Sequence, residues 1–220
     1  YRPLEYPMYQ IKYSINPVQT SPESIFQRAL GLHRSADLIQ ARALYAKALS
    51  LKPTYAEALH MLGVLEHNSG NNALAIDLIN KAIKLIPNEA SCYLNLANAQ
   101  KALNLSDEAL ANYDRAIDLQ PQYALAHSNR GGLLHEMHRS DEALLSLSRA
   151  IELNPNAADT YFNRGCIYRD QYKLDAAVAE YSKAIQLQEG FARAFLNRGI
   201  ALHEQLNLSA AIQDFDAATL

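Results

Sequence analysis

The sequence predicts an all-α fold, a solenoid of six helix-turn-helix repeats, and three observations lead to this prediction. Pro53, Pro87, Pro121 and Pro155 stand 34 residues apart. Two alanine positions recur with the same period, and a large apolar residue recurs between them. A fixed period of this length is typical of helical arrays, in which each unit buries its faces against its neighbours.

The register follows when the proline is placed at position 32 of a 34-residue unit. An N-terminal segment, residues 1–21, then precedes six repeats: 22–55, 56–89, 90–123, 124–157, 158–191 and the incomplete 192–220. Alanine fills position 20 (Ala41, Ala75, Ala109, Ala143, Ala177, Ala211) and position 27 (Ala48, Ala82, Ala116, Ala150, Ala184, Ala218). Because small residues let two helices approach closely, these positions predict a tight contact within each repeat.

Positions 8 and 24 indicate how that contact is filled. Position 24 is large and apolar throughout: Tyr45, Ile79, Tyr113, Leu147, Tyr181 and Phe215. Position 8 is small throughout: Ala29, Gly63, Ala97, Gly131, Gly165 and Gly199. A glycine inside a helix costs about 1 kcal/mol relative to alanine, so its recurrence predicts packing that leaves no room for a side chain.

Within each repeat, the first helix should cover roughly positions 1–14 and the second roughly positions 18–31. Turn-forming residues such as those of 69–72 separate the two helices. The proline at position 32 stops the second helix and biases the residue before it out of the helical region. The fifth repeat carries Glu189 instead of proline, and we expect the adjacent Gly190 to supply the break.

Residues 1–21 lack the repeat pattern. They are rich in tyrosine and proline and show no helical period, so we expect an extended segment. Two interpretations remain open for it: a flexible leader, or a peptide that lies on the solenoid of its own chain or of a neighbour.

The repeat pattern resembles that of the tetratricopeptide repeat over residues 22–220. The matching features are a bulky residue at position 4, small residues at 8, 20 and 27, an aromatic residue at 24 in four of the repeats and proline at 32 in the first four. The resemblance implies a right-handed α-solenoid whose concave groove is lined by the first helix of each repeat. It also implies a protein-interaction module, with a protein or peptide as partner.

Asparagine recurs at position 6 as Asn95, Asn129, Asn163 and Asn197, on the face that the resemblance assigns to the groove. An amide offers a donor and an acceptor together, so this row can hold the backbone of an extended peptide. The alternative is that these amides only order the groove itself.

Basic residues recur at position 12: His33, His67, Lys101, His135, Arg169 and His203. They predict either a basic row along the groove or a solvated polar face paired with acidic neighbours such as Glu136, Asp170 and Glu204. Equivalent residues of neighbouring repeats lie about 8–10 Å apart. Zinc ligands lie about 2 Å from a shared ion, so we expect no metal site here.

Composition narrows the function further. No catalytic motif occurs, so we expect neither enzyme activity nor a cofactor in this chain. The net charge of −3, with dispersed Lys and Arg, argues against nucleic acid as a partner. Cys92 and Cys166 read as free thiols, and no stretch suggests a membrane span or a signal peptide; together these predict a cytoplasmic protein.

Two alternatives to peptide binding come from the two ends of the array. Residues 44–71 are similar to the opening repeats of bacterial arrays that precede O-linked N-acetylglucosamine transferase-like domains, which implies a substrate-presenting arm of a larger glycosyltransferase. In the last helix, Ile212, Phe215, Ala211 and Ala218 form an apolar surface with no predicted cover. This surface predicts self-association, or a natural chain that continues past Leu220.

Overall fold

The computed structural model describes residues 20–219 and contains, within that range, twelve α-helices and no β-strand. The helices are α1 (Pro22–Arg34), α2 (Leu38–Leu51), α3 (Ala56–Asn68), α4 (Asn72–Leu85), α5 (Ala90–Lys101), α6 (Ser106–Leu119), α7 (Ala124–Glu136), α8 (Ser140–Leu153), α9 (Ala158–Asp170), α10 (Leu174–Leu187), α11 (Ala192–Glu204) and α12 (Leu208–Ala218). Two helices per repeat confirm the predicted solenoid of helix-turn-helix units. The expected extended segment lies almost wholly outside the described residues.

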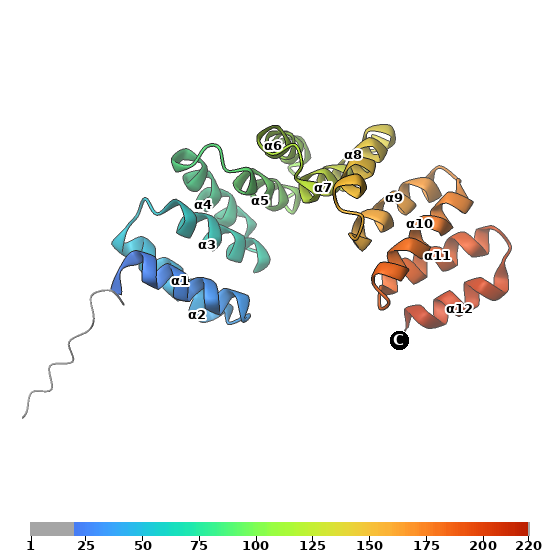
Figure 1. Ribbon diagram of the computed structural model, residues 1–220, viewed down its shortest axis with the longest axis horizontal. Coiled ribbons are helices and arrows are strands. Elements are labelled where there is room, and N and C mark those ends of the chain that lie inside the picture. The colour runs from blue at the N-terminus through green and yellow to red at the C-terminus, as the bar shows by residue number, and fades with distance from the viewer. Residues whose placement is uncertain (1–19, 220) are drawn as a thin grey trace, which may run out of the picture.

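The helices stack in chain order into an arch (Figure 1). Each helix packs on the next along the chain, and α3 with α5, α7 with α9 and α9 with α11 also touch. At the top of the arch α5 and α7 lie on the inner side, while α6 and α8 form the outer side. The first helices of the repeats therefore face the concave surface there.

The first helix of each repeat ends in the same left-handed turn. Position 15 has a positive φ in every repeat: Ala36, Gly70, Asn104, His138, Tyr172 and Leu206, at 56–83°. The next residue donates its backbone N–H to the carbonyl of position 11, as Arg139 does to Leu134 at 2.9 Å. This hydrogen bond is the Schellman closure of a helix C-terminus, and it holds residues as large as Tyr172 in a conformation that favours glycine.

The second helices of the first five repeats end at position 30 whether or not proline follows. Asn154 precedes a proline and has φ −141° and ψ 89°. Gln188 precedes Glu189 and has φ −141° and ψ 93°. The helix α10 therefore ends at the same position as the helices that a proline follows, and Gly190 lies beyond this end.

Small residues at positions 20 and 27 form the contact inside each repeat, as predicted. All are fully buried or nearly so except Ala218, which is half-buried in the last helix. At position 8, an added Cβ on Gly131 would lie 2.6 Å from Cγ of Leu147, the residue at position 24 of that repeat. The three other glycines at position 8 meet the residue at position 24 of their own repeats at 2.6–2.8 Å. The glycines are thus needed for close approach of the two helices.

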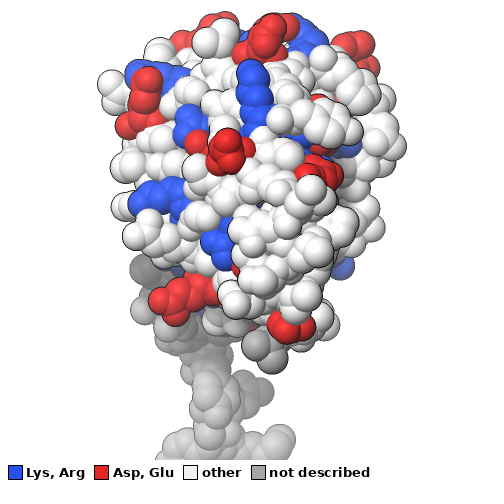
Figure 2. All heavy atoms as spheres, turned by 90° about the vertical axis from the view of Figure 1, so that its right-hand side faces the viewer, with Lys and Arg blue, Asp and Glu red and all other residues white. Residues whose placement is uncertain are grey.

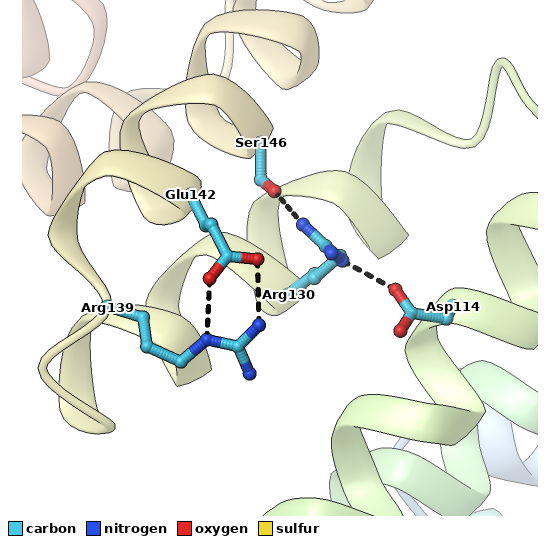
Figure 3. Close-up of polar contacts among 5 residues, drawn as sticks. All are labelled: Asp114, Arg130, Arg139, Glu142 and Ser146. Atoms are coloured by element: carbon cyan, nitrogen blue, oxygen red, sulfur yellow. Dashed lines mark hydrogen bonds and ion pairs between the residues drawn. The ribbon is translucent and has the colours of Figure 1, made fainter.

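Arginines at position 7 link the last three repeats. Each bonds to position 25 of the preceding repeat and to position 23 of its own: Arg130 to Asp114 and Ser146, Arg164 to Ser148 and Glu180, and Arg198 to Ser182 and Asp214. Figure 3 shows the first of these arginine bridges, with Arg130 reaching from α7 to α6 and α8. In the second and third repeats position 7 is leucine, so those repeats have no equivalent arginine bridge at this position.

Candidate functional site: the concave groove

Two hollows overlap at the middle of the concave surface. The central hollow, of about 390 Å³, is lined by residues that include His67, Asn98, Lys101, Asn129 and Asn163. The repeat-4 hollow, of about 370 Å³, is lined by residues that include Leu125, Asn129, Asn154, Asp159, Asn163 and Arg193. Both hollows contain Asn129 and Asn163, so these two amides lie where one hollow passes into the other.

The four asparagines of position 6 have different partners. Asn95 donates to Nε2 of His60 at 2.9 Å, and Asn129 donates to Oδ1 of Asn98 at 2.9 Å. Asn197 donates to the backbone carbonyl of Arg193 at 2.9 Å and accepts from the guanidinium of Arg169. These three amides help to order the groove, which was the alternative to peptide binding.

Asn163 differs from the other three. Its amide makes no hydrogen bond with any other residue between 20 and 219, although it is partly buried on the lining of both hollows. Gly132 leaves open space beside it, since an added Cβ at that glycine would lie 3.6 Å from the amide nitrogen of Asn163. Asn163 therefore presents an unused donor and acceptor to the groove.

The basic row of position 12 is largely paired within the protein. Lys101 lies 2.8 Å from Glu136, His135 lies 2.8 Å from Asp170, and Arg169 lies 3.3 Å from the same aspartate. In each interaction between repeats the acid stands at position 13 of the next repeat. His33 contacts the hydroxyl of Tyr45 and His67 contacts Oδ1 of Asn72, whereas His203 is exposed. These pairs agree with the solvated polar face that we held open as the alternative.

Two groove residues were missed by the sequence argument. Asn98 at position 9 accepts hydrogen bonds from the hydroxyl of Tyr113 at 2.7 Å and from Asn129. His60 at position 5 is buried, with 8% of its surface exposed, and its Nε2 accepts the hydrogen bond from the Asn95 amide. Both positions share a helix face with position 6, so helical spacing marks their place. The repeat pattern did not single them out, because no other repeat has asparagine at position 9 or histidine at position 5.

Burial shifts the pKa values of His60 and of the two cysteines. Desolvation lowers the pKa of His60 below its usual range, although the nearby carboxylate of Glu89 opposes the shift. Because the amide N–H of Asn95 points at Nε2, that nitrogen accepts and the neutral ring is the matching form. Burial also raises the pKa of Cys92 to about 12 and raises that of Cys166, so neither free thiol is poised as a nucleophile.

Comparison with protein families matches three models of the same repeat. A model described as TPR repeat matches residues 106–138 and 165–205, and two described as tetratricopeptide repeat match residues 147–179 and 26–90. The chain belongs to the tetratricopeptide-repeat family. A search of the curated proteins found no match.

Several solved structures share the fold of this tetratricopeptide-repeat chain. MamA is 26% identical with a TM-score of 0.64, over 74% of this chain and 89% of that protein. YrrB, described as a TPR protein with an unusual peptide-binding site, is 25% identical with a TM-score of 0.64, over 87% and 95%. PilW, a type IV pilus biogenesis factor, has a TM-score of 0.81 at 21% identity, over 88% and 90%.

Two further findings concern the described residues only. No helix among them is long and apolar enough to cross a lipid bilayer. Residues 20–219 also contain no group of three or more His, Cys, Asp or Glu side chains arranged to hold a metal ion.

Proposed function

We propose that this chain is a protein-interaction module that binds an extended segment of a partner protein in its concave groove. The observation that carries the proposal is the pair Asn129 and Asn163, shared by two adjoining hollows, with the Asn163 amide unused. The solved YrrB structure, described as having a peptide-binding site, supports the same use of this fold. The proposal assigns no catalysis and no cofactor to the chain.

The spacing of the row suits an extended peptide. Neighbouring first helices lie roughly 10 Å apart, and an extended chain rises about 3.3 Å per residue. Successive asparagines would then meet every third peptide group. Each amide can accept from a peptide N–H and donate to a peptide carbonyl without reading the side chain.

The test compares the wild-type chain with an Asn129→Ala, Asn163→Ala double variant in selections from a phage-displayed random peptide library. Each neutral hydrogen bond contributes roughly 0.5–1.5 kcal/mol, so a selected peptide that loses one bond at each site should bind the double variant about 5- to 150-fold more weakly. Asn80→Ala, which removes an exposed amide from α4 at position 25, is the matched control and should bind normally. Equal affinity for both variants would refute the proposal.

The basic row enters the proposal as a second set of groove contacts. If His33, His67 and His203 contact an anionic segment together with Lys101 and Arg169, binding should weaken as added salt screens the charges. Affinity that stays constant between low and high salt would assign the row to the solvated face that Glu136 and Asp170 already suggest.

Self-association through the last helix is a second candidate, and the exposure of α12 favours it. Ile212 and Leu208 are 59% and 53% exposed, and Phe215 is only half-buried although it packs on Gly199. Ala211, by contrast, is buried and contributes nothing to an open surface. Of the four residues that the sequence analysis assigned to the apolar surface of the last helix, only Ile212, Phe215 and Ala218 are therefore accessible.

Three finer points remain proposals. The face of the C-terminal repeats carries basic and acidic side chains interspersed (Figure 2), which supports a protein rather than a nucleic acid as partner. Free Cys92 and Cys166 are compatible with the reducing cytoplasm. The substrate-presenting arm of a glycosyltransferase would use the same asparagine row, and the gene sequence that follows residue 220 would test it.

A further inference from the structure

A third hollow, which we call the repeat-2 hollow, opens near the N-terminal end of the groove. It encloses about 390 Å³ and its lining includes the apolar side chains of Phe26, Leu30, Met61 and Ile86. This volume falls within the range of small-ligand sites, so one large side chain of a bound segment can enter it. The floor offers burial of apolar surface rather than hydrogen bonds.

The rim of the repeat-2 hollow is acidic. Glu57 and Glu89 both line it, both are exposed, and neither forms an ion pair with a cation among residues 20–219. The Glu89 carboxylate accepts hydrogen bonds from the backbone N–H and the hydroxyl of Ser91, and from no other described residue. The nearby Lys52 is already paired with Glu23 at 3.0 Å, and the buried His60 is held neutral by desolvation. Within residues 20–219, therefore, neither carboxylate has an ion-pair partner, and the positive charge of Lys52, which acts on Glu57, is already paired with Glu23.

The repeat-2 hollow and the repeat-4 hollow occupy the same register two repeats apart. Position 6 is Met61 in one and Asn129 in the other, and position 31 is Ile86 in one and Asn154 in the other. Equivalent places in one groove thus have different chemistry. Two helix spacings amount to about 20 Å, which corresponds to about six residues of extended chain.

We propose that the repeat-2 hollow determines specificity by taking an apolar side chain that stands next to a Lys or Arg of the bound segment. The apolar side chain packs on Phe26, Leu30 and Met61, and the cation lies between Glu57 and Glu89. About six residues away, the backbone of the same segment meets Asn129 and Asn163. This inference rests on the proposed function, because it specifies the peptide that the groove binds.

The test selects peptides about 12 residues long, enough to span both hollows when extended, from a random phage library on the full chain. Enriched peptides should share an aliphatic or aromatic residue beside Lys or Arg, about six residues from an uncharged stretch. One selected peptide is then synthesised with its basic residue intact or replaced by glutamine. By fluorescence anisotropy, the replacement should weaken binding roughly 2- to 5-fold, as expected for an exposed charge pair.

The matched protein variant is Glu57→Gln, Glu89→Gln, which removes both charges and keeps the oxygen that bonds Ser91. It should bind the basic peptide as weakly as wild type binds the glutamine peptide, with no further loss when the two changes are combined. Glu108→Gln, an exposed change on α6 outside the hollow, should leave binding unchanged.

The outcomes separate this inference from the proposed function. Enriched peptides without a basic residue, or full affinity of the Glu57→Gln, Glu89→Gln variant, would overturn the inference while binding still depended on Asn129 and Asn163. Failure of the library to enrich any peptide over bare beads would overturn both.

Discussion

The adjacent glycines Gly131 and Gly132 of α7 have different surroundings. Gly131 faces the second helix of its repeat, where an added Cβ would lie 2.6 Å from Cγ of Leu147 and 3.2 Å from the carbonyl oxygen of Ala143. Gly132 faces the groove, where the nearest atom to an added Cβ is the Asn163 amide nitrogen at 3.6 Å. The same residue type thus serves close packing at one position and open space at the next.

This difference predicts opposite effects of alanine in one helix. Gly131→Ala should lower the free energy of unfolding by roughly 1–3 kcal/mol, because Leu147 must leave its position. Gly132→Ala should leave it unchanged or raise it by up to about 1 kcal/mol, because alanine favours helix and meets no clash. Urea unfolding of both variants checks the prediction, and equal destabilisation would contradict it.

His60 gives a prediction about pH. Its folded-state pKa lies below the unfolded value near 6.5, so the unfolded chain binds the proton more readily as the pH falls. As the pH drops below about 6.5, the free energy of unfolding should therefore decrease, and this residue contributes at most about 1.4 kcal/mol per pH unit to the decrease. Protonation of Nε2 would also remove the acceptor that Asn95 uses.

Replacing the ring with an uncharged amide isolates this effect. Unfolding curves at about pH 7.5 and 5.5 should differ less for His60→Gln than for the wild-type chain. His33, whose pKa is also lowered by burial, accounts for part of the remaining slope. His203→Gln, a change at an exposed site, should keep the wild-type slope, and an unchanged slope in His60→Gln would refute the assignment.

Helix ends show how neighbouring elements override local signals. The helix α10 ends at Leu187, although no proline follows, and its cap residue matches the backbone of Asn154 before Pro155. The left-handed turn after each first helix likewise forms with alanine, histidine, tyrosine or leucine in place of glycine. Packing of both helices on the adjacent repeat fixes these ends, so the local residue only adjusts their stability.

Two arginines of the fourth repeat, Arg130 and Arg139, differ in the partners that they hold (Figure 3). The side chain of Arg130 is 22% exposed and bridges Asp114 on α6 to Ser146 on α8, whereas Arg139 pairs with Glu142 at the start of its own helix. Arg130→Met should lower the free energy of unfolding by about 1–2 kcal/mol, because the buried Ser146 hydroxyl loses its partner. Arg139→Met should cause no measurable change in thermal unfolding. The reverse order would show that the inter-repeat bridge is not stabilising.

The array as a whole is asymmetric in how its repeats are joined and covered. Apolar residues at position 7 join the second and third repeats to their neighbours, whereas the arginine bridges join the last three. Burial at positions 24 and 27 is also lower in α12, where Phe215 and Ala218 are half-buried while their equivalents in earlier repeats are fully buried or nearly so. Terminal repeats of such arrays need a polar outer face to stay soluble.

Ile212 provides the test of self-association at this scale. If α12 meets another copy, sedimentation velocity should show a mass that rises with concentration, and Ile212→Lys should abolish the rise by placing a charge in the contact. Ile39→Lys, a change at the well-exposed position 18 of α2, is the control and should leave the association intact. A monomer at every concentration would refute this candidate.

The sequence by itself determined the fold, because each repeat buries its faces only against its neighbours and the same spacing must recur. Ala41, Gly131 and Tyr181 could be assigned to packing from their columns alone. It also placed the asparagine row and the basic row on one helix face. The residue pattern could not assign partners to these side chains, since their contacts reach across to the next repeat.

Only the tertiary structure decided those contacts. Asn95 bonds to His60 and Asn129 bonds to Asn98, whereas the Asn163 amide makes no hydrogen bond with another described residue, although all three occupy the same column. The stacking geometry sets which side chain of the adjacent repeat comes within hydrogen-bonding distance, and the residues at those neighbouring positions do not recur. The fold follows from periodic apolar burial, whereas the site follows from polar contacts between unlike neighbours.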